Sequence, residues 1–589
     1  MNGSLVRAGI LMVAVGLAGC ATRPVAEEAK APATAGSPPM AETPEAAPAA
    51  PGKPAKAAPP MDPEVMYKIL VAEVAIQRGQ YDLAIKNYLE LGKTLRDPRL
   101  LERAAKISVY AHDNQHALEA AKLWVELEPD NIEAREVVTA FYIRNGDYDE
   151  AQQQLETLLK INGENDSNAF MLIAGLLGRQ QDKQAALEVM QRLVNSRPDD
   201  PNALFAMSHL AVRAGVLDQA EKAIKRVVEL QPDRVDAQIQ EARILTMRGK
   251  STEALGIMEK AVKKHPGEIA LRTTYARLLV DTEQMKKAYA QFKLVNKQKP
   301  DQPDILLALG VVAIELNRVN EGEKYFLRLN HLNRGYESES SYYLGRIAED
   351  FRKDPDKAIK WYSKVDHGEQ YLESQIRIAF LLAKKGDVDQ ARGQLSAITP
   401  RGPGQVMRIY LADGQILRNA GRLEEAIEVF TAGLGELPGN NDLLYARAMA
   451  EDKLGQLAAM ERDLKKIISR DPDNVDALNA LGYSLADRTT RYDEALEYIK
   501  RALELRPDSY FVLDSMGWVN YRLGHYQEAV TYLRRALDLS SDSEIAAHLT
   551  EVLWVMGDKD GARAVWDKAL KVAPGNKLLL DVMNRLDHK

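Results

Sequence analysis

Two groups of polar residues have the types and spacing that could do chemistry. Residues 249–251 (GKS) look like the end of a phosphate-binding loop. That loop needs a second glycine five residues earlier, where this chain has Ile244. His112 and His116 are four residues apart, a spacing that could hold a metal ion on one helix. No third ligand is evident beside them, and both groups fall where we expect turns between helices.

The remaining polar residues form no catalytic arrangement. No Ser/His/Asp signature and no paired-carboxylate motif stands out from the background of charged residues. We interpret the scattered Asp and Glu side chains as helix-surface residues. The sequence therefore predicts a protein that is not an enzyme and that has no metal, no cofactor and no small-molecule substrate.

The single cysteine, Cys20, lies where a lipid could be attached. Residues 1–20 (MNGSLVRAGILMVAVGLAGC) carry one positive charge, followed by an apolar run that is too short to cross a membrane but suits a signal peptide. The final four residues, LAGC, resemble the bacterial lipobox, which implies that residues 1–19 are a lipoprotein signal peptide and that Cys20 is acylated. The alternative is an ordinary signal peptide with an incidental cysteine.

The residues after Cys20 predict a tether. Residues 21–62 are nearly all Ala, Pro, Glu, Lys, Thr and Gly and include no aromatic residue. Such a segment cannot bury enough apolar surface to fold, and proline keeps it extended at about 3.1 Å per residue. We therefore expect residues 20–62 to be a lipidated, disordered linker. By resemblance to lipoprotein sorting signals, Ala21 in place of Asp implies the outer membrane, with the rest of the chain in the periplasm.

The rest of the chain repeats itself at a fixed period. Residues 491–507 read RYDEALEYIKRALELRP and residues 525–541 read HYQEAVTYLRRALDLSS, so that Ala495 and Ala529 align 34 residues apart. Apolar residues recur at spacings of three and four, which indicates one helix face, and proline ends the first of these helices. With a partner helix upstream, this unit resembles the tetratricopeptide repeat (TPR).

The same small residue can be followed through the whole array. The steps are mostly 34 residues, and the anchors are Ala84, Ala117, Ala151, Ala185, Ala220, Ala254, Ala288, Gly322, Ala358, Ala391, Ala426, Met460, Ala495, Ala529 and Ala562. The sequence therefore predicts an all-α fold, a right-handed α-solenoid of about 15 tetratricopeptide-type helix pairs over residues 63–589. We expect residues 317–404 to be less regular, because the register slips there, and residues 577–588 to form an amphipathic capping helix.

Composition excludes several classes of protein. The chain has 28% charged and 46% hydrophobic residues and a net charge of −7. Acidic and basic residues are interleaved without a basic stripe, so nucleic acid is not an expected partner. One cysteine cannot form an intramolecular disulfide. What remains is a protein-binding array.

In a TPR superhelix, the first helix of each pair lines a concave groove. Its exposed positions are the second, fifth, ninth, twelfth and thirteenth of the repeat. In the C-terminal repeats, the candidate groove residues are Tyr445, Met449, Asn479, Tyr483, Phe511, Asp514, Trp518, Tyr521, Arg522, Glu551 and Trp554. Trp, Tyr and Arg dominate binding hot spots. The alternative is that these aromatic residues fill gaps between repeats, as we expect for Trp124, Trp361 and Trp566 on second helices.

Lipobox, Ala/Pro-rich tether and long TPR array together resemble the LbcA-type lipoproteins. The more specific stretches are residues 342–349 (YYLGRIAE), residues 371–379 (YLESQIRIA) and residues 479–507, continuing to Trp518. The resemblance implies an outer-membrane adaptor that binds the periplasmic carboxyl-terminal processing protease CtpA and brings it cell-wall hydrolase substrates. TPR residues alone do not identify a partner.

Two classes of function remain open. The first is a non-catalytic lipoprotein scaffold that links a processing protease to peptidoglycan hydrolases. The second is an assembly factor for a type IV pilus secretin or an exopolysaccharide export machinery. The sequence leaves open which repeats bind, the oligomeric state and the identity of the partners.

Overall fold

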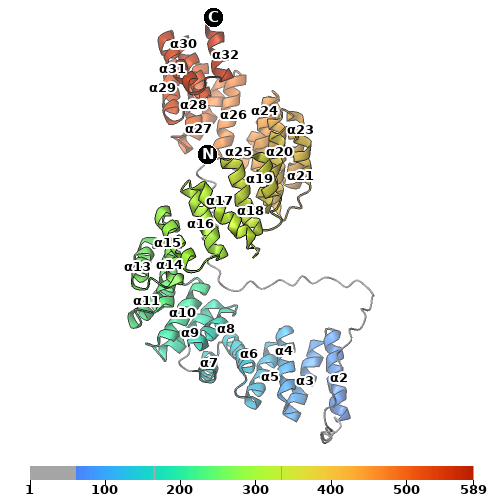
Figure 1. The fold of residues 1–589 in the computed structure, drawn as a ribbon. Helices are drawn as coiled ribbons and strands as arrows, with labels where there is room; N and C mark the ends of the chain where they lie inside the picture. Colours follow the sequence, from blue (N-terminus) through green and yellow to red (C-terminus); the bar gives the residue numbers. More distant parts are fainter. Residues whose placement is uncertain (1–61, 164–166, 333, 588–589) are drawn as a thin grey trace, which may run out of the picture. The chain divides into compact units, whose positions relative to one another are not determined.

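The computed structural model describes residues 62–163, 167–332 and 334–587 (Figure 1). Every regular element in these ranges is helical. The signal peptide, Cys20 and the linker up to residue 61 lie outside the described residues. The chain divides into two compact units, residues 1–322 and 323–589.

The first unit contains helix pairs joined by short turns. Each pair has an even-numbered first helix and an odd-numbered second helix. They are α2 (Pro63–Gln77), α3 (Tyr81–Leu95), α4 (Pro98–Tyr110), α5 (Asn114–Leu127), α6 (Ile132–Asn145), α7 (Tyr148–Asn162), α8 (Ser167–Gly178), α9 (Lys183–Asn195), α10 (Pro201–Ala214), α11 (Leu217–Leu230), α12 (Val235–Met247), α13 (Ser251–Lys264), α14 (Ile269–Asp281), α15 (Met285–Gln298) and α16 (Pro303–Glu315). Helix α17 (Val319–His331) begins in this unit and ends in the next.

The second unit continues the same alternation and ends on an unpaired helix. Its helices are α18 (Glu337–Arg346), the π-helix η1 (Ile347–Phe351), α19 (Pro355–Tyr362), α20 (Tyr371–Lys384), α21 (Val388–Ser396), α22 (Pro403–Asn419), α23 (Leu423–Glu436), α24 (Asn441–Lys453), α25 (Leu457–Arg470), α26 (Val475–Arg488), α27 (Tyr492–Leu505), α28 (Tyr510–Leu523), α29 (Tyr526–Leu539), α30 (Ser543–Val555), α31 (Lys559–Val572) and α32 (Lys577–Asp587). Fifteen pairs followed by α32 confirm the predicted fold class, an all-α array of tetratricopeptide-type pairs.

Small residues let the two helices of a pair approach closely. All fifteen anchor residues lie on second helices and are buried. In the pair α28–α29, a Cβ atom on Gly517 would lie 2.5 Å from Leu533 Cγ and 3.2 Å from the Ala529 carbonyl oxygen. A larger side chain at this crossing would overpack the core. Gly524 then ends α28 in a left-handed conformation (φ 83°) that glycine adopts without steric cost.

Residues 317–404 contain the shortest helices of the described chain. α18 has 10 residues, α19 has 8 and α21 has 9. The π-helix η1 follows α18 directly. Its Glu349 accepts hydrogen bonds from Tyr362 Oη (2.7 Å) and from Arg377 Nη1 (3.0 Å), so side chains of α19 and α20 hold it in place.

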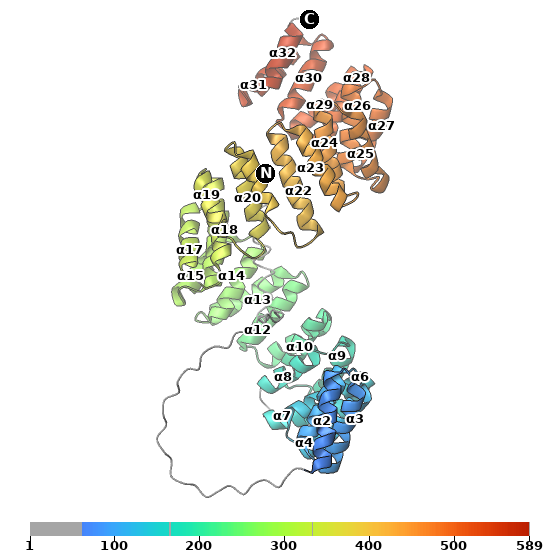
Figure 2. The same ribbon diagram turned by 90° about the vertical axis from the view of Figure 1, so that its right-hand side faces the viewer.

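The C-terminal end of the second unit positions the candidate site. The first helices α26, α28 and α30 are consecutive neighbours (Figures 1 and 2). Helix α32 packs on α30 through Leu579, Val582 and Leu586, and Trp566 Nε1 donates a hydrogen bond to the Leu579 carbonyl oxygen at 2.7 Å. None of the helices in the described residues is long and apolar enough to cross a membrane.

Candidate protein-binding face

The first helices of the last four repeats share one set of positions, which we call the first-helix face. It consists of the second, fifth, ninth, twelfth and thirteenth repeat positions on α24, α26, α28 and α30. These residues are Asp442, Tyr445, Met449, Asp452 and Lys453; Asp476, Asn479, Tyr483, Ala486 and Asp487; Phe511, Asp514, Trp518, Tyr521 and Arg522; and Glu544, Ala547, Glu551, Trp554 and Val555.

The structure leaves most of the predicted groove residues partly accessible and buries two of them. Half-buried are Tyr445, Met449, Asn479, Tyr483, Phe511, Tyr521, Arg522, Glu551 and Trp554. Asp514 and Trp518 are each only 7% exposed, so the expectation that these two positions are open to solvent is wrong. Contact of any of these residues with a partner stays a prediction. Of the other tryptophans, Trp124 is buried, whereas Trp361 and Trp566 are half-buried.

Trp518 is buried because neighbouring first helices close around it. Its ring stacks on the His548 ring of α30, with centroids 4.2 Å apart and planes at 24°. Its indole Nε1 donates a hydrogen bond to Asp487 Oδ1 of α26 at 3.2 Å. The Tyr521 ring lies 5.1 Å away on the same helix. Trp518 therefore fills the space between repeats, as the alternative interpretation of the sequence stated.

A buried histidine–carboxylate pair joins α30 to α28. His548 is 8% exposed, and its Nδ1 lies 2.9 Å from Asp514 Oδ1. Burial by itself lowers the pKa of His548, but the hydrogen bond to Asp514 and the negative charges of Asp514, Glu544 and Glu551 outweigh it. The net effect raises the pKa of His548 above its ordinary value, which favours the charged imidazolium.

Two tyrosines extend these contacts along the face. Tyr483 Oη on α26 donates a hydrogen bond to Glu544 Oε1 on α30 at 3.1 Å, and Tyr521 Oη on α28 donates to Glu551 Oε1 at 3.3 Å. Burial and the nearby carboxylates raise the pKa of Tyr483, and burial and Glu551 raise the pKa of Tyr521 to about 12, so both groups stay neutral donors near neutral pH. Three successive first helices thus share one connected set of side chains.

Basic side chains also contact this set. Arg522 Nη1 donates to the Asp487 carbonyl oxygen at 2.8 Å, and its Nη2 donates to Tyr492 Oη at 2.9 Å. Arg585 of the capping helix pairs with Glu551 at 3.2 Å. The Trp554 ring carries a cation on its face, with Lys559 Nζ 4.8 Å from the centroid.

Sequence reasoning missed three residues of this arrangement. Asp487 and Glu544 occupy the thirteenth and second positions of their repeats, so the same spacing that selected their neighbours also marks them. His548 occupies the sixth position of its repeat, which is not one of the five expected groove positions. Its role follows only from its contacts with Asp514 and Trp518, which lie 34 and 30 residues earlier.

The two groups first considered for chemistry lie at turns. Gly249 (φ 76°) stands between α12 and α13, and Lys250 Nζ contacts Glu221 Oε1 at 3.1 Å. His116 Nδ1 lies 2.6 Å from Asp113 Oδ2 at the start of α5. Over the described ranges, no group of three or more His, Cys, Asp or Glu side chains could hold a metal ion.

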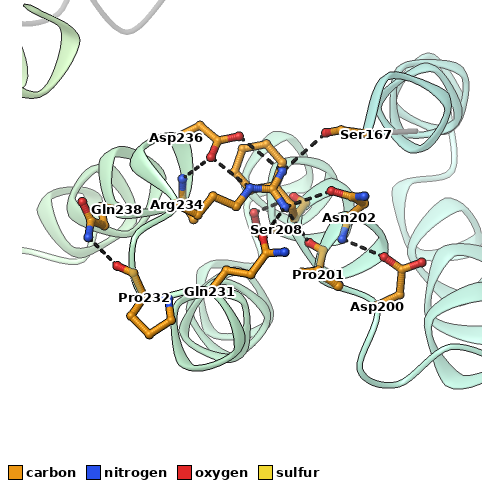
Figure 3. A network of polar contacts seen from close by, with 12 residues as sticks. Ser167, Asp200, Pro201, Asn202, Ser208, Gln231, Pro232, Arg234, Asp236 and Gln238 are labelled. Carbon is orange, nitrogen blue, oxygen red and sulfur yellow. Dashed lines mark hydrogen bonds and ion pairs between the residues drawn. The ribbon is translucent and has the colours of Figure 1, made fainter. Parts of the chain in front are cut away.

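A second polar network, centred on Arg234, joins three first helices of the other unit (Figure 3). Arg234 precedes α12, and its guanidinium donates to Asp236 (2.9 Å), Asn202 (2.9 Å), Gln231 (3.2 Å), the Pro201 carbonyl oxygen (3.4 Å) and Ser167 of α8 (3.4 Å). It also lies 4.5 Å from the centroid of the Phe205 ring. All three guanidinium nitrogens have acceptors within the chain, although the buried Gln238 Oε1 on α12 has no hydrogen-bond donor.

An all-helical array of pairs with small anchors at a 34-residue period defines a tetratricopeptide-repeat solenoid. Family models described as "Tetratricopeptide repeat" match residues 142–201, 205–269, 245–305, 377–441, 442–474, 473–542 and 515–577. TPR repeat-containing protein PA4667 of Pseudomonas aeruginosa is 35% identical over 500 residues, which are 82% of each chain. This chain therefore belongs to the tetratricopeptide-repeat family, whose arrays serve as protein–protein interaction scaffolds.

Two solved structures are also similar to this chain over part of its length. A thermophilic TPR protein of Thermus thermophilus has 27% identity and a TM-score of 0.28, over 32% of this chain and 98% of its own. The complex titled Naa15/Naa10 bound to HypK-THB has 14% identity and a TM-score of 0.30, over 89% of this chain and 100% of its own.

Proposed function

We propose that this protein is a lipid-anchored periplasmic adaptor that binds other proteins on its first-helix face. In this account it holds a carboxyl-terminal processing protease near its cell-wall hydrolase substrates at the outer membrane. The observation that carries the proposal is the gathering of predicted groove residues on α26, α28 and α30. Half-buried Tyr483, Phe511 and Tyr521 offer there an aromatic surface, and tyrosine is one of the residues that dominate binding hot spots.

The anchor and the partners are proposed from the sequence. The lipobox ending in Cys20 and the Ala/Pro-rich residues 21–62 support a tethered position at a membrane. The resemblance to LbcA-type lipoproteins supports the protease and the hydrolases as partners. No metal, cofactor or enzymatic activity is part of the proposal.

A matched pair of tyrosine variants tests the binding face. Tyr521 and Tyr532 are both half-buried and pack against the same hydrophobic clusters, but Tyr521 lies on a first helix and Tyr532 on the second helix α29. Truncating an interface aromatic commonly costs about 2 kcal/mol, or about thirtyfold in affinity. We expect Tyr521→Ala to weaken partner capture by that order and Tyr532→Ala to leave capture unchanged at equal helicity.

Identification of the captured proteins tests the partner class. The full-length chain is cross-linked in intact cells and recovered in detergent, and its partners are identified by mass spectrometry. A processing protease together with peptidoglycan hydrolases supports the proposal. Recovery of a secretin or an export complex instead would favour the assembly-factor function and overturn the adaptor.

A single substitution tests the anchor. Cys20→Ser removes the thiol that would be acylated. We expect this variant to incorporate no labelled palmitate and to leave the membrane fraction. Palmitate incorporation at the unsubstituted level would contradict acylation at Cys20.

A further inference from the structure

We propose that Arg418 of α22 and Tyr445 of α24 together bind the carboxylate of an Asp or Glu side chain of the partner protein. This inference rests on the proposed function as a protein scaffold and names one group that the partner must carry. It extends the first-helix face by one helix, because α22 is the first helix that precedes α24. It is carried by two neighbouring hydrogen-bond donors that have no acceptor among the described residues.

Arg418 and Tyr445 both occupy expected groove positions. Arg418 is the twelfth residue of its repeat, and Tyr445 is the fifth residue of the next repeat. Both side chains are half-buried, and α22 and α24 are neighbouring first helices (Figure 2). The two side chains also interact electrostatically. Burial lowers the pKa of Arg418, and Tyr445 opposes this effect.

Neither donor is satisfied in the part of the chain that the structure describes. Arg418 Nε is buried without a hydrogen-bond partner, and the guanidinium makes no ion pair with any described carboxylate. The Tyr445 hydroxyl likewise makes no hydrogen bond to a described residue. A buried donor without an acceptor is unfavourable, and more so when it belongs to a charged group. A ligand that brings an acceptor would relieve this cost.

Arginines at comparable places have acceptors inside the chain. Arg488 in the last turn of α26 pairs with Asp452 at 3.2 Å, and Arg522 in the last turn of α28 donates to the Asp487 carbonyl oxygen at 2.8 Å. Arg418 also lies in a last turn, where a positive charge interacts favourably with the helix dipole. The dipole does not explain the buried Nε, because a fully solvated cation would serve it equally well.

A carboxylate fits these donors better than a neutral acceptor does. The guanidinium presents parallel N–H groups that match the two oxygens of a carboxylate, and charge-assisted hydrogen bonds are the strong ones. The neighbouring first helices α20 and α24 also carry an exposed cation in their last turns, Lys384 and Lys453. Three consecutive first helices therefore place positive charge at the same end.

The surroundings favour a single acidic side chain within an extended segment. Burial and the charge of Asp476 raise the pKa of Tyr445, whereas Arg418 lowers it, so a carboxylate of the chain itself lies near one side of the site. A segment with many negative charges would be repelled there. First helices continue on both sides of α22, so a bound segment can extend in both directions, as a side chain allows and a chain end does not.

Three labelled peptides test the carboxylate with the full-length chain. The first has one Glu among Ala and Leu residues and an amidated C-terminus. The second has Gln in place of Glu, and the third has Gln together with a free terminal carboxylate. Fluorescence anisotropy measures binding at low and high salt. We expect the Glu peptide to bind about tenfold more tightly than either Gln peptide, with weaker binding at high salt.

Two variants and a matched control locate the binding. Arg418→Met keeps the length of the side chain and removes its charge and donors, and Tyr445→Phe removes only the hydroxyl. The control, Arg534→Met, removes an exposed arginine of the second helix α29. We expect Arg418→Met to weaken binding of the Glu peptide about tenfold, Tyr445→Phe about threefold and the control not at all.

Thermal unfolding separates a binding role of Arg418 from a structural one. Because the Arg418 guanidinium has no acceptor to lose, we expect Arg418→Met to unfold at no lower temperature than the unsubstituted chain. A lower unfolding temperature together with lost binding would show that Arg418 is a structural residue and would overturn the site.

The other outcomes also decide the proposal. Equal binding of the Glu peptide and its Gln counterpart, including no binding of either, or an equal loss in the control variant, overturns the carboxylate site. Tightest binding of the peptide with the free terminus overturns the side chain as the source. If Tyr521→Ala reduces capture of the cellular partner but Arg418→Met does not, the scaffold function stands and the carboxylate site is wrong. If neither reduces capture, the first-helix face is not the binding site.

Discussion

The Arg234 network and the first-helix face both join three successive first helices, but they differ in their balance of donors and acceptors. Every guanidinium nitrogen of Arg234 has an acceptor within the chain, and one aromatic ring covers it (Figure 3). On the face of α26, α28 and α30, Trp518, Tyr483 and Tyr521 donate to the carboxylates of Asp487, Glu544 and Glu551. The first arrangement surrounds one cation with acceptors, whereas in the second neutral aromatic donors meet carboxylates, two of which also pair with Arg522 and Arg585.

This difference indicates that repeats of the same kind can serve stability in one region of the chain and binding in another. A buried polar network with all its groups satisfied rigidifies the helices that it joins. A face that keeps half-buried aromatic rings accessible can contribute to binding instead. The same first-helix positions can therefore hold repeats together in one region and offer a binding surface in another.

The largest expected effect comes from removing the buried indole. Trp518→Ala should cost about 3–5 kcal/mol of local stability, because it opens a cavity between α26, α28 and α30. Repeats contact only their neighbours, so hydrogen exchange should show lost protection in these helices and unchanged protection in α8, α10 and α12. Trp554→Ala, at a half-buried tryptophan, should cost clearly less. Lost protection throughout both regions would contradict a solenoid with local stability.

Removal of Arg234 should lower the stability of the repeats around α8, α10 and α12 and leave partner binding unchanged. Arg234→Ala removes a donor shared by half-buried and exposed acceptors and should destabilise α8, α10 and α12 by about 1 kcal/mol. The control is Arg226→Ala on α11, an exposed arginine paired with Asp199 and Glu229, whose loss should cost less than about 0.5 kcal/mol. Hydrogen exchange and partner capture are measured together. Lost capture without lost protection would make the Arg234 network a binding site.

A smaller effect on the stability of the C-terminal repeats should depend on pH. Because its pKa is raised, His548 contributes stability that is fully present below the ordinary histidine pKa of about 6.5 and is lost as pH rises through the raised value. Thermal unfolding of the C-terminal repeats should therefore occur at lower temperature as pH increases through this range. His548→Leu should remove that pH dependence. An unchanged pH dependence in the variant would show that the Asp514–His548 pair is not its source.

Much of the fold could be predicted from the sequence. The anchors, which are thirteen alanines with Gly322 and Met460, mark the helix crossings, and each lies buried on a second helix. Spacing from these anchors also placed Tyr483, Tyr521 and Glu551 on neighbouring first helices. The strict spacing of the anchors therefore predicts both the secondary structure and the direction of the side chains.

Burial and pairing inside the candidate site could not be predicted in the same way. A ninth-position tryptophan is open or closed according to what the next repeat places over it, and here His548 covers Trp518. That contact depends on packing between helices that are distant in sequence. In the π-helix η1, Glu349 accepts hydrogen bonds from Tyr362 and Arg377. No local sequence pattern predicts these contacts.

Photo-cross-linking in living cells tests the binding face most directly. Benzoylphenylalanine replaces Phe511, a half-buried residue of the first-helix face, or Leu539, an exposed residue on the second helix α29. We predict partner cross-links from position 511 that weaken in the Tyr521→Ala background, and none from position 539. Cross-links from position 539 alone would place the partner on the second helices and contradict the account.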